Sequence, residues 1–195
     1  MERQDLIIAG VGGQGILTIA SVIGRAAVER GLHIKQSEVH GMAQRGGAVV
    51  SHVRLSSRPV DSDLIPPGGA AIILALEPME GLRYLPFARE DAVLVVNRNP
   101  VRNVASYPDL DRVLARVRGW RRNVIVDAEA LAREAGTHRA VNSVMLGTAS
   151  PFMILGPDDL AGALGAFLAR RGADVVAANL RAFAMGRDAA RAANV

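Results

Sequence analysis

Short runs of apolar residues alternate with longer amphipathic runs along most of the chain. Uniformly apolar runs of this length are typical of strands buried on both faces of a parallel sheet. We expect such strands at Leu6–Ala9, Ala71–Leu76, Ala92–Asn97 and Asn123–Val126. The amphipathic runs predict helices at Gln14–Arg30, Glu77–Phe87, Asp109–Arg118 and Ala128–Ala135. This order predicts an α/β fold that is Rossmann-like and doubly wound, with a mostly parallel sheet and helices on both faces.

Two further segments change this pattern. His33–Gln36 predicts a short second strand, and Ala48–Leu55 alternates in polarity, which predicts an antiparallel or half-exposed strand. Between them, Glu38–Gly47 has neither period and is expected to be a loop, with at most one helical turn. From about residue 140 onward only helices are predicted, at Asn142–Ala149, Asp158–Arg171 and Asp174–Ala193. We expect one domain over residues 1–195, whose helical C-terminal portion closes the sheet or docks on another subunit.

Composition narrows the range of functions. The formal charge of +4 is small, arginines are scattered and aromatic residues make up only 4%, so nucleic acid is not an expected partner. The sequence contains no cysteine, which excludes disulfides, a thiolate nucleophile and cysteine-ligated iron–sulfur clusters within it. No apolar run approaches the length of a membrane span, and the N-terminal residues lack the apolar core of a signal peptide. We therefore expect a cytoplasmic protein that makes no contact with a membrane.

The first strand leads into a glycine turn and a helix. Gly10, Gly12 and Gly15 have the G-x-G-x-x-G spacing of dinucleotide-binding loops. Free backbone N–H groups at such a helix start suit a phosphate or another anion. Glycines at this turn also serve close packing of strand on helix, so the spacing alone leaves ligand binding and packing equally open.

The second segment, Glu38–Gly47, adds polar candidates beside further glycines. Glu38 lies near the position where a dinucleotide-binding fold holds the ribose, although it could equally bind Arg45 or cap a turn. His40 and His52 are candidate acid–base groups or metal ligands, but no third ligand stands at zinc spacing.

Other polar residues favour structural interpretations. Glu77 and Glu80 show no pairing pattern and are expected to be solvated acids, and Asn142-Ser143 is expected to cap a helix. No G-x-S-x-G nucleophile elbow is present. The sequence therefore predicts no self-sufficient catalytic machinery and no metal site.

Taken in order, these segments resemble the gamma subunit or domain of 2-oxoacid:ferredoxin oxidoreductases, and within that family the beta subunit of the indolepyruvate type. The resemblance is carried by Gly10–Thr18, Glu38–Gly47 and Val49–Arg54. It continues through Glu77-Pro78, Val95–Asn97, Val126–Ala128 and Asn142–Gly147. The two glycine-containing segments in tandem are much more specific than either one alone.

The resemblance implies a multi-subunit enzyme that converts a 2-oxoacid and coenzyme A to an acyl-coenzyme A and carbon dioxide, passing electrons to ferredoxin. Thiamine diphosphate, Mg and iron–sulfur clusters would lie on a large partner subunit, and ferredoxin would bind through the complex. This chain would be an accessory subunit that binds no cofactor alone, has no catalytic residue and is inactive when isolated, where it could form a homodimer. By this resemblance Gly12, Gly13, Gln14 and Gly15 would shape the loop at the top of the sheet, and Gln44 and Arg45 would lie near the coenzyme A or partner side. The candidate cofactor-binding residues are Gly10, Gly12, Gly13, Gln14, Gly15, Glu38, His40, Gln44, Arg45, Gly46 and Gly47. The alternative from the glycine loop and Glu38 is a stand-alone NAD(P)- or flavin-binding oxidoreductase.

Overall fold

The structure is a computed structural model that describes residues 2–40, 46–102, 106–193 and 195. Its strands are β1 (Arg3–Val11), β2 (His33–His40), β3 (Ala48–Ser56), β4 (Ala70–Ala75), β5 (Ala88–Asn97) and β6 (Asn123–Val126). Its α-helices are α1 (Ile16–Glu29), α2 (Pro78–Arg83), α3 (Leu110–Arg118), α4 (Ala128–Glu134), α5 (Val141–Ala149), α6 (Pro157–Leu168) and α7 (Ala173–Ala192). Short 3-10 turns at Leu85–Phe87, His138–Ala140, Ser150–Phe152 and Ala169–Arg171 join or extend the helices.

The strands of the described residues form one six-stranded sheet in the order β2-β3-β1-β4-β5-β6. Strands β1, β4, β5 and β6 pair in parallel, while β3 is antiparallel to both of its neighbours. The mostly parallel α/β fold and the antiparallel third strand are thus confirmed. Strand β3 is nevertheless buried along nearly its whole length rather than half-exposed, because chain segments cover it on both faces.

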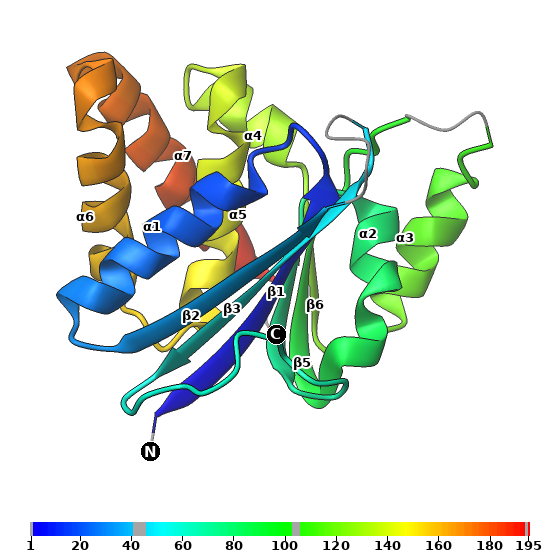
Figure 1. Cartoon of the computed structure of the whole chain (residues 1–195). Helices are drawn as coiled ribbons and strands as arrows, with labels where there is room; N and C mark the ends of the chain where they lie inside the picture. The colour runs from blue at the N-terminus through cyan, green and yellow to red at the C-terminus, as the bar shows by residue number, and fades with distance from the viewer. Residues whose placement is uncertain (1, 41–45, 103–105, 194) are drawn as a thin grey trace.

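Helices cover both faces of the sheet, as expected (Figure 1). Helix α1 and the helices α4 to α7 lie on one face, where they enclose the larger apolar core. Helices α2 and α3 lie on the other face over a smaller core, to which the segment 57–69 contributes Ile65. The C-terminal helices therefore close the sheet, because α5 packs between the strands and α7.

Close contact between α5 and α7 depends on two glycines. A Cβ at Gly147 would collide with the carbonyl of Phe183, and a Cβ at Gly186 would collide with the carbonyl of Val144. The absence of both side chains lets the two helix backbones touch. Phe183 is itself buried in the larger core.

Several predicted boundaries were wrong. Strand β2 continues to His40, so Glu38 and His40 belong to a strand rather than to a loop. Helix α2 ends at Arg83, and the segment up to Phe87 forms a 3-10 turn containing Pro86. Strand β5 begins at Ala88 rather than Ala92, since the strand continues on the N-terminal side of its apolar run through exposed charged residues.

The expected helix cap at Asn142-Ser143 was also wrong, since Ala140 occupies the N-cap position of α5. Asn142 instead donates to the carbonyl oxygen of Gly15 at 3.2 Å. Ser143 donates to Asn179 on α7 at 2.7 Å. Both side chains therefore join α5 to distant parts of the fold. No helix among the described residues is long and apolar enough to cross a bilayer.

Candidate functional site

The glycine loop joins β1 to α1 at the edge of the sheet where the parallel strands end (Figure 1). Gly13 and Gly15 adopt φ angles of 101° and 80°, which L side chains rarely reach. Gly15 is the N-cap of α1 and supplies no side-chain cap to the helix. The first turn of α1 therefore presents backbone N–H groups that a ligand can approach.

Gln14 holds the loop in this shape. Its Oε1 accepts a hydrogen bond from the backbone N–H of Val11 at 2.7 Å, and its Nε2 donates to the carbonyl oxygen of Leu76 at 3.0 Å. A Cβ at Gly10 would lie 2.7 Å from Gln14 Oε1. Gly10 is therefore needed for packing, and Gln14 is a structural brace between β1 and the end of β4.

The two glycine-containing segments lie side by side. Gly12 N donates to Gly47 O at 2.8 Å, and Gly46 N donates to Gly12 O at 3.3 Å. The adjacent strands β1 and β3 pair Gly10 with Val49. These contacts explain why the two motifs occur together in the sequence. Gln44 and Arg45, which were predicted at the same site, lie outside the described residues.

A cavity of about 330 Å³ lies between the glycine loop and Glu38. It is lined by Val11, Gly12, Gly13, Gly15, Ile16, Leu17, Glu38 and Val49. The Oε2 atom of Glu38 is buried and has no hydrogen-bond partner among the described residues. Glu38 reaches the loop although β3 lies between β2 and β1. In the dinucleotide-binding fold, the strand that carries the ribose-binding acid is instead adjacent to the first strand. The His40 backbone pairs with Val49 at the same end of the sheet.

This arrangement can accept a ligand with two kinds of group. An anionic group suits the uncapped start of α1, and a hydroxyl or amine donor suits the Glu38 carboxylate oxygen that has no partner in the described part of the chain. A bare phosphate next to Glu38 would meet a carboxylate, so the cavity favours an anion that also carries hydrogen-bond donors.

A second polar cluster on the opposite side of the loop was missed by sequence reasoning. Glu77 and Glu80 are only 2% and 6% exposed and are not the solvated acids that were expected. Glu77 accepts from Glu80 N through Oε2 at 3.0 Å and from the Tyr107 hydroxyl through Oε1. Burial, together with this bond to Glu77, raises the pKa of Tyr107. Glu77 thus caps α2 and also binds the hydroxyl of Tyr107. The second contact is tertiary, so no local sequence signal predicts it.

Around Glu80, burial raises the carboxyl pKa, while Arg83 opposes the shift through a 2.9 Å hydrogen bond. These acids line a small cavity of about 270 Å³ together with Gly46 and Gly47. The cluster therefore borders the second glycine segment from the α2 side.

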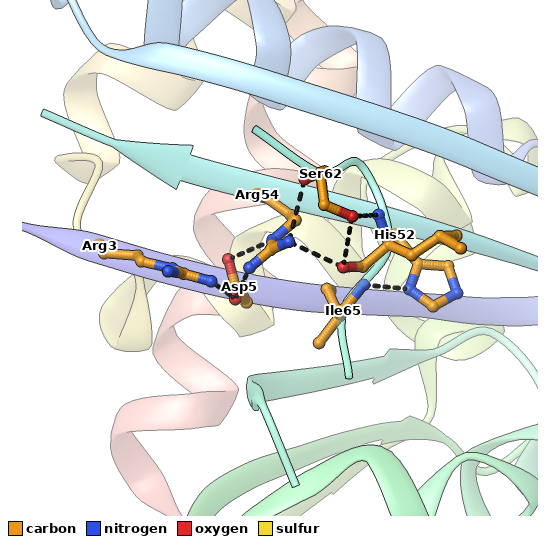
Figure 2. A network of polar contacts seen from close by, with 7 residues as sticks. Arg3, Asp5, His52, Arg54, Ser62 and Ile65 are labelled. Atoms are coloured by element: carbon orange, nitrogen blue, oxygen red, sulfur yellow. Dashed lines mark hydrogen bonds and ion pairs between the residues drawn. The ribbon is translucent and has the colours of Figure 1, made fainter. Parts of the chain in front are cut away.

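Figure 2 shows a third polar network. It lies on the α2 face of the sheet, since its member Ile65 belongs to the smaller core. Arg54 forms two hydrogen bonds to Asp5, at 3.2 and 3.1 Å, and also donates to the carbonyl oxygens of Ser62 and Leu64. His52 accepts from Ile65 N through Nδ1 at 3.1 Å. The network fastens the segment 57–69 to the sheet.

His52 is therefore a structural residue rather than an acid–base catalyst. Its ring contacts Phe87 edge-on at 5.6 Å between centroids, and burial lowers its pKa. Among the described residues, no three His, Asp or Glu side chains are placed to hold a metal ion.

Comparison with known proteins gives a match along nearly the whole chain. The family described as "Pyruvate ferredoxin/flavodoxin oxidoreductase" matches residues 5–189. The indolepyruvate oxidoreductase subunit IorB of Archaeoglobus fulgidus is 41% identical over 152 residues, which are 74% of this chain and 75% of that protein. The IorB subunit of Thermococcus kodakarensis is 35% identical over 98% of each chain.

Two solved structures have the same fold. The gamma subunit of a keto/oxoacid ferredoxin oxidoreductase from Geobacter sulfurreducens aligns with a TM-score of 0.71 at 24% identity, over 97% of this chain and 99% of that one. The 2-oxoglutarate:ferredoxin oxidoreductase of Magnetococcus marinus, solved with 2-oxoglutarate, coenzyme A and succinyl-CoA bound, aligns with a TM-score of 0.79 at 21% identity. That match covers 98% of this chain and 32% of the larger chain, so this chain spans about a third of that protein.

Proposed function

The chain belongs to the pyruvate ferredoxin/flavodoxin oxidoreductase family, and from this premise we propose that it is the accessory subunit of an indolepyruvate-type 2-oxoacid:ferredoxin oxidoreductase. The observation that carries the proposal is the 35% identity to an IorB subunit across 98% of both chains. The match is therefore from subunit to subunit, rather than from one domain to part of a larger enzyme. A stand-alone dinucleotide enzyme is not favoured, because the relatives are subunits.

In the proposed reaction, a 2-oxoacid, coenzyme A and two oxidised ferredoxins give an acyl-coenzyme A, carbon dioxide, a proton and two reduced ferredoxins. We assign thiamine diphosphate, Mg and the iron–sulfur clusters to a large partner subunit. This assignment is supported by the sequence, which has no cysteine to ligate a cluster. Bound to the partner, thiamine diphosphate supplies carbanion stabilisation and the clusters supply electron transfer.

For this chain we propose a wall of the coenzyme A entrance, built from the glycine loop, Glu38 and the segment that contains Gln44 and Arg45. The uncapped start of α1 suits an anion, and Glu38 has a buried oxygen that no donor among the described residues reaches. Coenzyme A carries both phosphates and hydroxyl donors, so it has the two kinds of group that the cavity can accept. The chain's own contribution is to bind and orient that cosubstrate.

The subunit assignment is tested by reconstitution. The chain is purified alone and also co-expressed with a thiamine-binding large subunit, and coenzyme A-dependent reduction of ferredoxin is measured with indolepyruvate, phenylpyruvate, pyruvate and 2-oxoglutarate. We expect no turnover by the isolated chain, and turnover of the aryl 2-oxoacids by the complex. Turnover by the isolated chain, or failure of the two chains to associate, would contradict the assignment.

The variant Arg45→Ala, measured in the complex, distinguishes a role of this segment in binding coenzyme A from a role in assembly alone. Loss of a guanidinium that contacts phosphate should raise the KM for coenzyme A by about tenfold and leave complex formation intact. The matched control is Arg25→Ala, which removes an exposed arginine that pairs with Glu29 on α1. A weakened complex with an unchanged KM for coenzyme A would show that this segment serves assembly alone.

A further inference from the structure

Another cavity, distinct from the one beside Glu38, has a volume of about 700 Å³. It lies within the helical layer, between the start of α1, the corner before α5, the end of α6 and the start of α7. This volume is in the range of pockets that enclose small organic ligands. None of the residues discussed for the coenzyme A wall lines it.

The floor of this cavity is apolar and buried. Ile19, Leu146, Leu164 and Leu168 line it, and each is at most 5% exposed. These side chains come from three different helices, α1, α5 and α6, so the floor belongs to the packed core of the helical layer. A ligand seated there would gain by burying an apolar body.

One wall of the cavity carries a buried polar pair, Ser143 and Asn179, which are 3% and 7% exposed. Ser143 Oγ donates to Asn179 Oδ1 at 2.7 Å, and Asn179 Nδ2 donates to Val175 O at 2.8 Å. A primary amide has two N–H groups, and the contacts among the described residues use one of them. Asn179 can therefore donate a hydrogen bond to a ligand from a position that water reaches poorly.

The mouth of the cavity is positively polarised. The first turns of α1, α5 and α7 contribute Thr18, Asn142 and Asp174 to the lining, and none of these helices has a side-chain N-cap. Helix starts carry partial positive charge. Arg139 and Arg171 also line the cavity, and their guanidinium groups form no ion pair with another described residue.

We propose that this cavity binds one small organic monocarboxylate with an apolar aryl or branched body. Two guanidinium groups and the Asp174 carboxylate leave a single net positive charge at the mouth, which one carboxylate balances. Arginine pairs with carboxylates through two parallel hydrogen bonds, and the apolar floor holds the rest of the ligand. The site is a property of this chain alone and goes beyond its proposed role as a wall for coenzyme A.

Calorimetric titration of the full chain tests the proposal with phenylacetate and phenylpyruvate as probes. We expect saturable binding with one site per chain, and the ratio of the two affinities tells whether a plain acid or a 2-oxoacid is preferred. Arg171→Gln and Arg139→Gln should each weaken binding by about tenfold. Arg170→Gln is the matched control, because this exposed neighbour does not line the cavity and its loss should leave the affinity unchanged.

A further variant tests the cavity without changing the charge of any side chain that lines it. Val175→Trp places a bulky ring at the mouth from a position that is already 37% exposed, so it should block binding without unfolding the chain, which circular dichroism checks. The proposal is overturned if neither acid binds, if Arg171→Gln and Arg139→Gln bind as the Arg170→Gln control does, or if Val175→Trp binds normally. Displacement of phenylacetate by equimolar inorganic phosphate or coenzyme A would also overturn it, since either would assign the cavity to phosphate.

Because the chain is titrated without a partner, the result does not depend on whether the subunit assignment holds. A chain that binds phenylacetate but never associates with a large subunit would retain this inference and lose the proposed function. The reverse result would retain the proposed function and lose this inference.

Discussion

At the scale of single residues, Gln14 stabilises the glycine loop through hydrogen bonds that its place in the motif does not predict. Its amide satisfies one donor on β1 and one acceptor at the end of β4. Gln14→Ala leaves the Val11 N–H without this acceptor in a part-buried position, whereas the Leu76 carbonyl keeps the Asn97 amide as a donor at 3.3 Å. The free energy of unfolding should therefore fall by about 1–3 kcal/mol. Urea titration measures this loss. Gln36→Ala, on the exposed part of β2, is the control and should change stability by less than about 0.5 kcal/mol.

His52 predicts a pH dependence of stability. Burial lowers its pKa below the ordinary value of 6.5, and the Asp63 carboxylate opposes this shift only in part. Between those two pKa values the unfolded chain binds a proton that the native state does not, so the free energy of unfolding should fall as the pH falls through 6.5 and level off below the native pKa. Urea titrations between about pH 8 and pH 5 measure this slope.

His52→Gln should lower stability at neutral pH, because the Ile65 N–H loses its imidazole acceptor, and should also flatten the acid-side slope. His33→Gln removes an exposed imidazole at the start of β2 and corrects for the loss of one histidine. A slope in His52→Gln as steep as that of the wild type would refute this account of the buried ring.

Residue roles that depend on distant partners could not be predicted from the sequence. Asn142-Ser143 had the local pattern of a helix cap, yet the two side chains bind Gly15 and Asn179, which are 127 and 36 residues away along the chain. Glu77 was similarly expected to be solvated. That prediction failed because one of its hydrogen-bond partners, Tyr107, is distant in the sequence. Local propensity describes only the bonds that are available within a few residues.

At the scale of elements, the α5–α7 contact gives the sharpest prediction. Gly147→Ala and Gly186→Ala each place a methyl group against the backbone of the facing helix, and they should lower the free energy of unfolding by about 1–3 kcal/mol or more. Thermal and urea unfolding measure the change. Gly162→Ala on α6 is the matched control, since a Cβ there meets nothing within 4 Å.

The control should raise stability by about 0.5–1 kcal/mol, because alanine is the better helix former in an exposed position. Equal effects at all three glycines would mean that helix propensity, rather than contact between α5 and α7, decides the outcome. Destabilisation confined to Gly147 and Gly186 would support the packing account.

The elements that were predicted well are those whose apolar run ends at a local polar signal. Strand β6 was expected at Asn123–Val126 and lies there, because its short apolar run ends at the cap Asp127. Strand β5 was predicted too short, since Arg89, Glu90 and Asp91 extend from the sheet into solvent and break the apolar pattern. Periodicity reports which residues are buried, so it fails where a strand leaves the core.

At the scale of the whole molecule, the parallel strands end at one edge, and the glycine loop lies there together with the start of α1 (Figure 1). The sequence predicted the glycine loop and the second glycine segment as motifs in tandem, but not the hydrogen bonds between them. It could not predict the 700 Å³ cavity, whose lining comes from α1 and from helices more than a hundred residues further on. Such a site is set by how helices pack, and no local motif records it.

The C-terminal helices were predicted as part of one domain, and unfolding tests this. Trp120, the only tryptophan, packs against the smaller core on the α2 face, whereas α5 and α7 belong to the larger core on the opposite face. In a single cooperative unit, Trp120 fluorescence and far-ultraviolet circular dichroism should change at the same urea concentration. The variant Trp120→Phe with Phe152→Trp moves the reporter to a residue that packs against the larger core, and its midpoint should agree with its own dichroism. Separate midpoints for the two reporters, each compared with dichroism of the same variant, would show instead that the helical layer unfolds as a unit of its own.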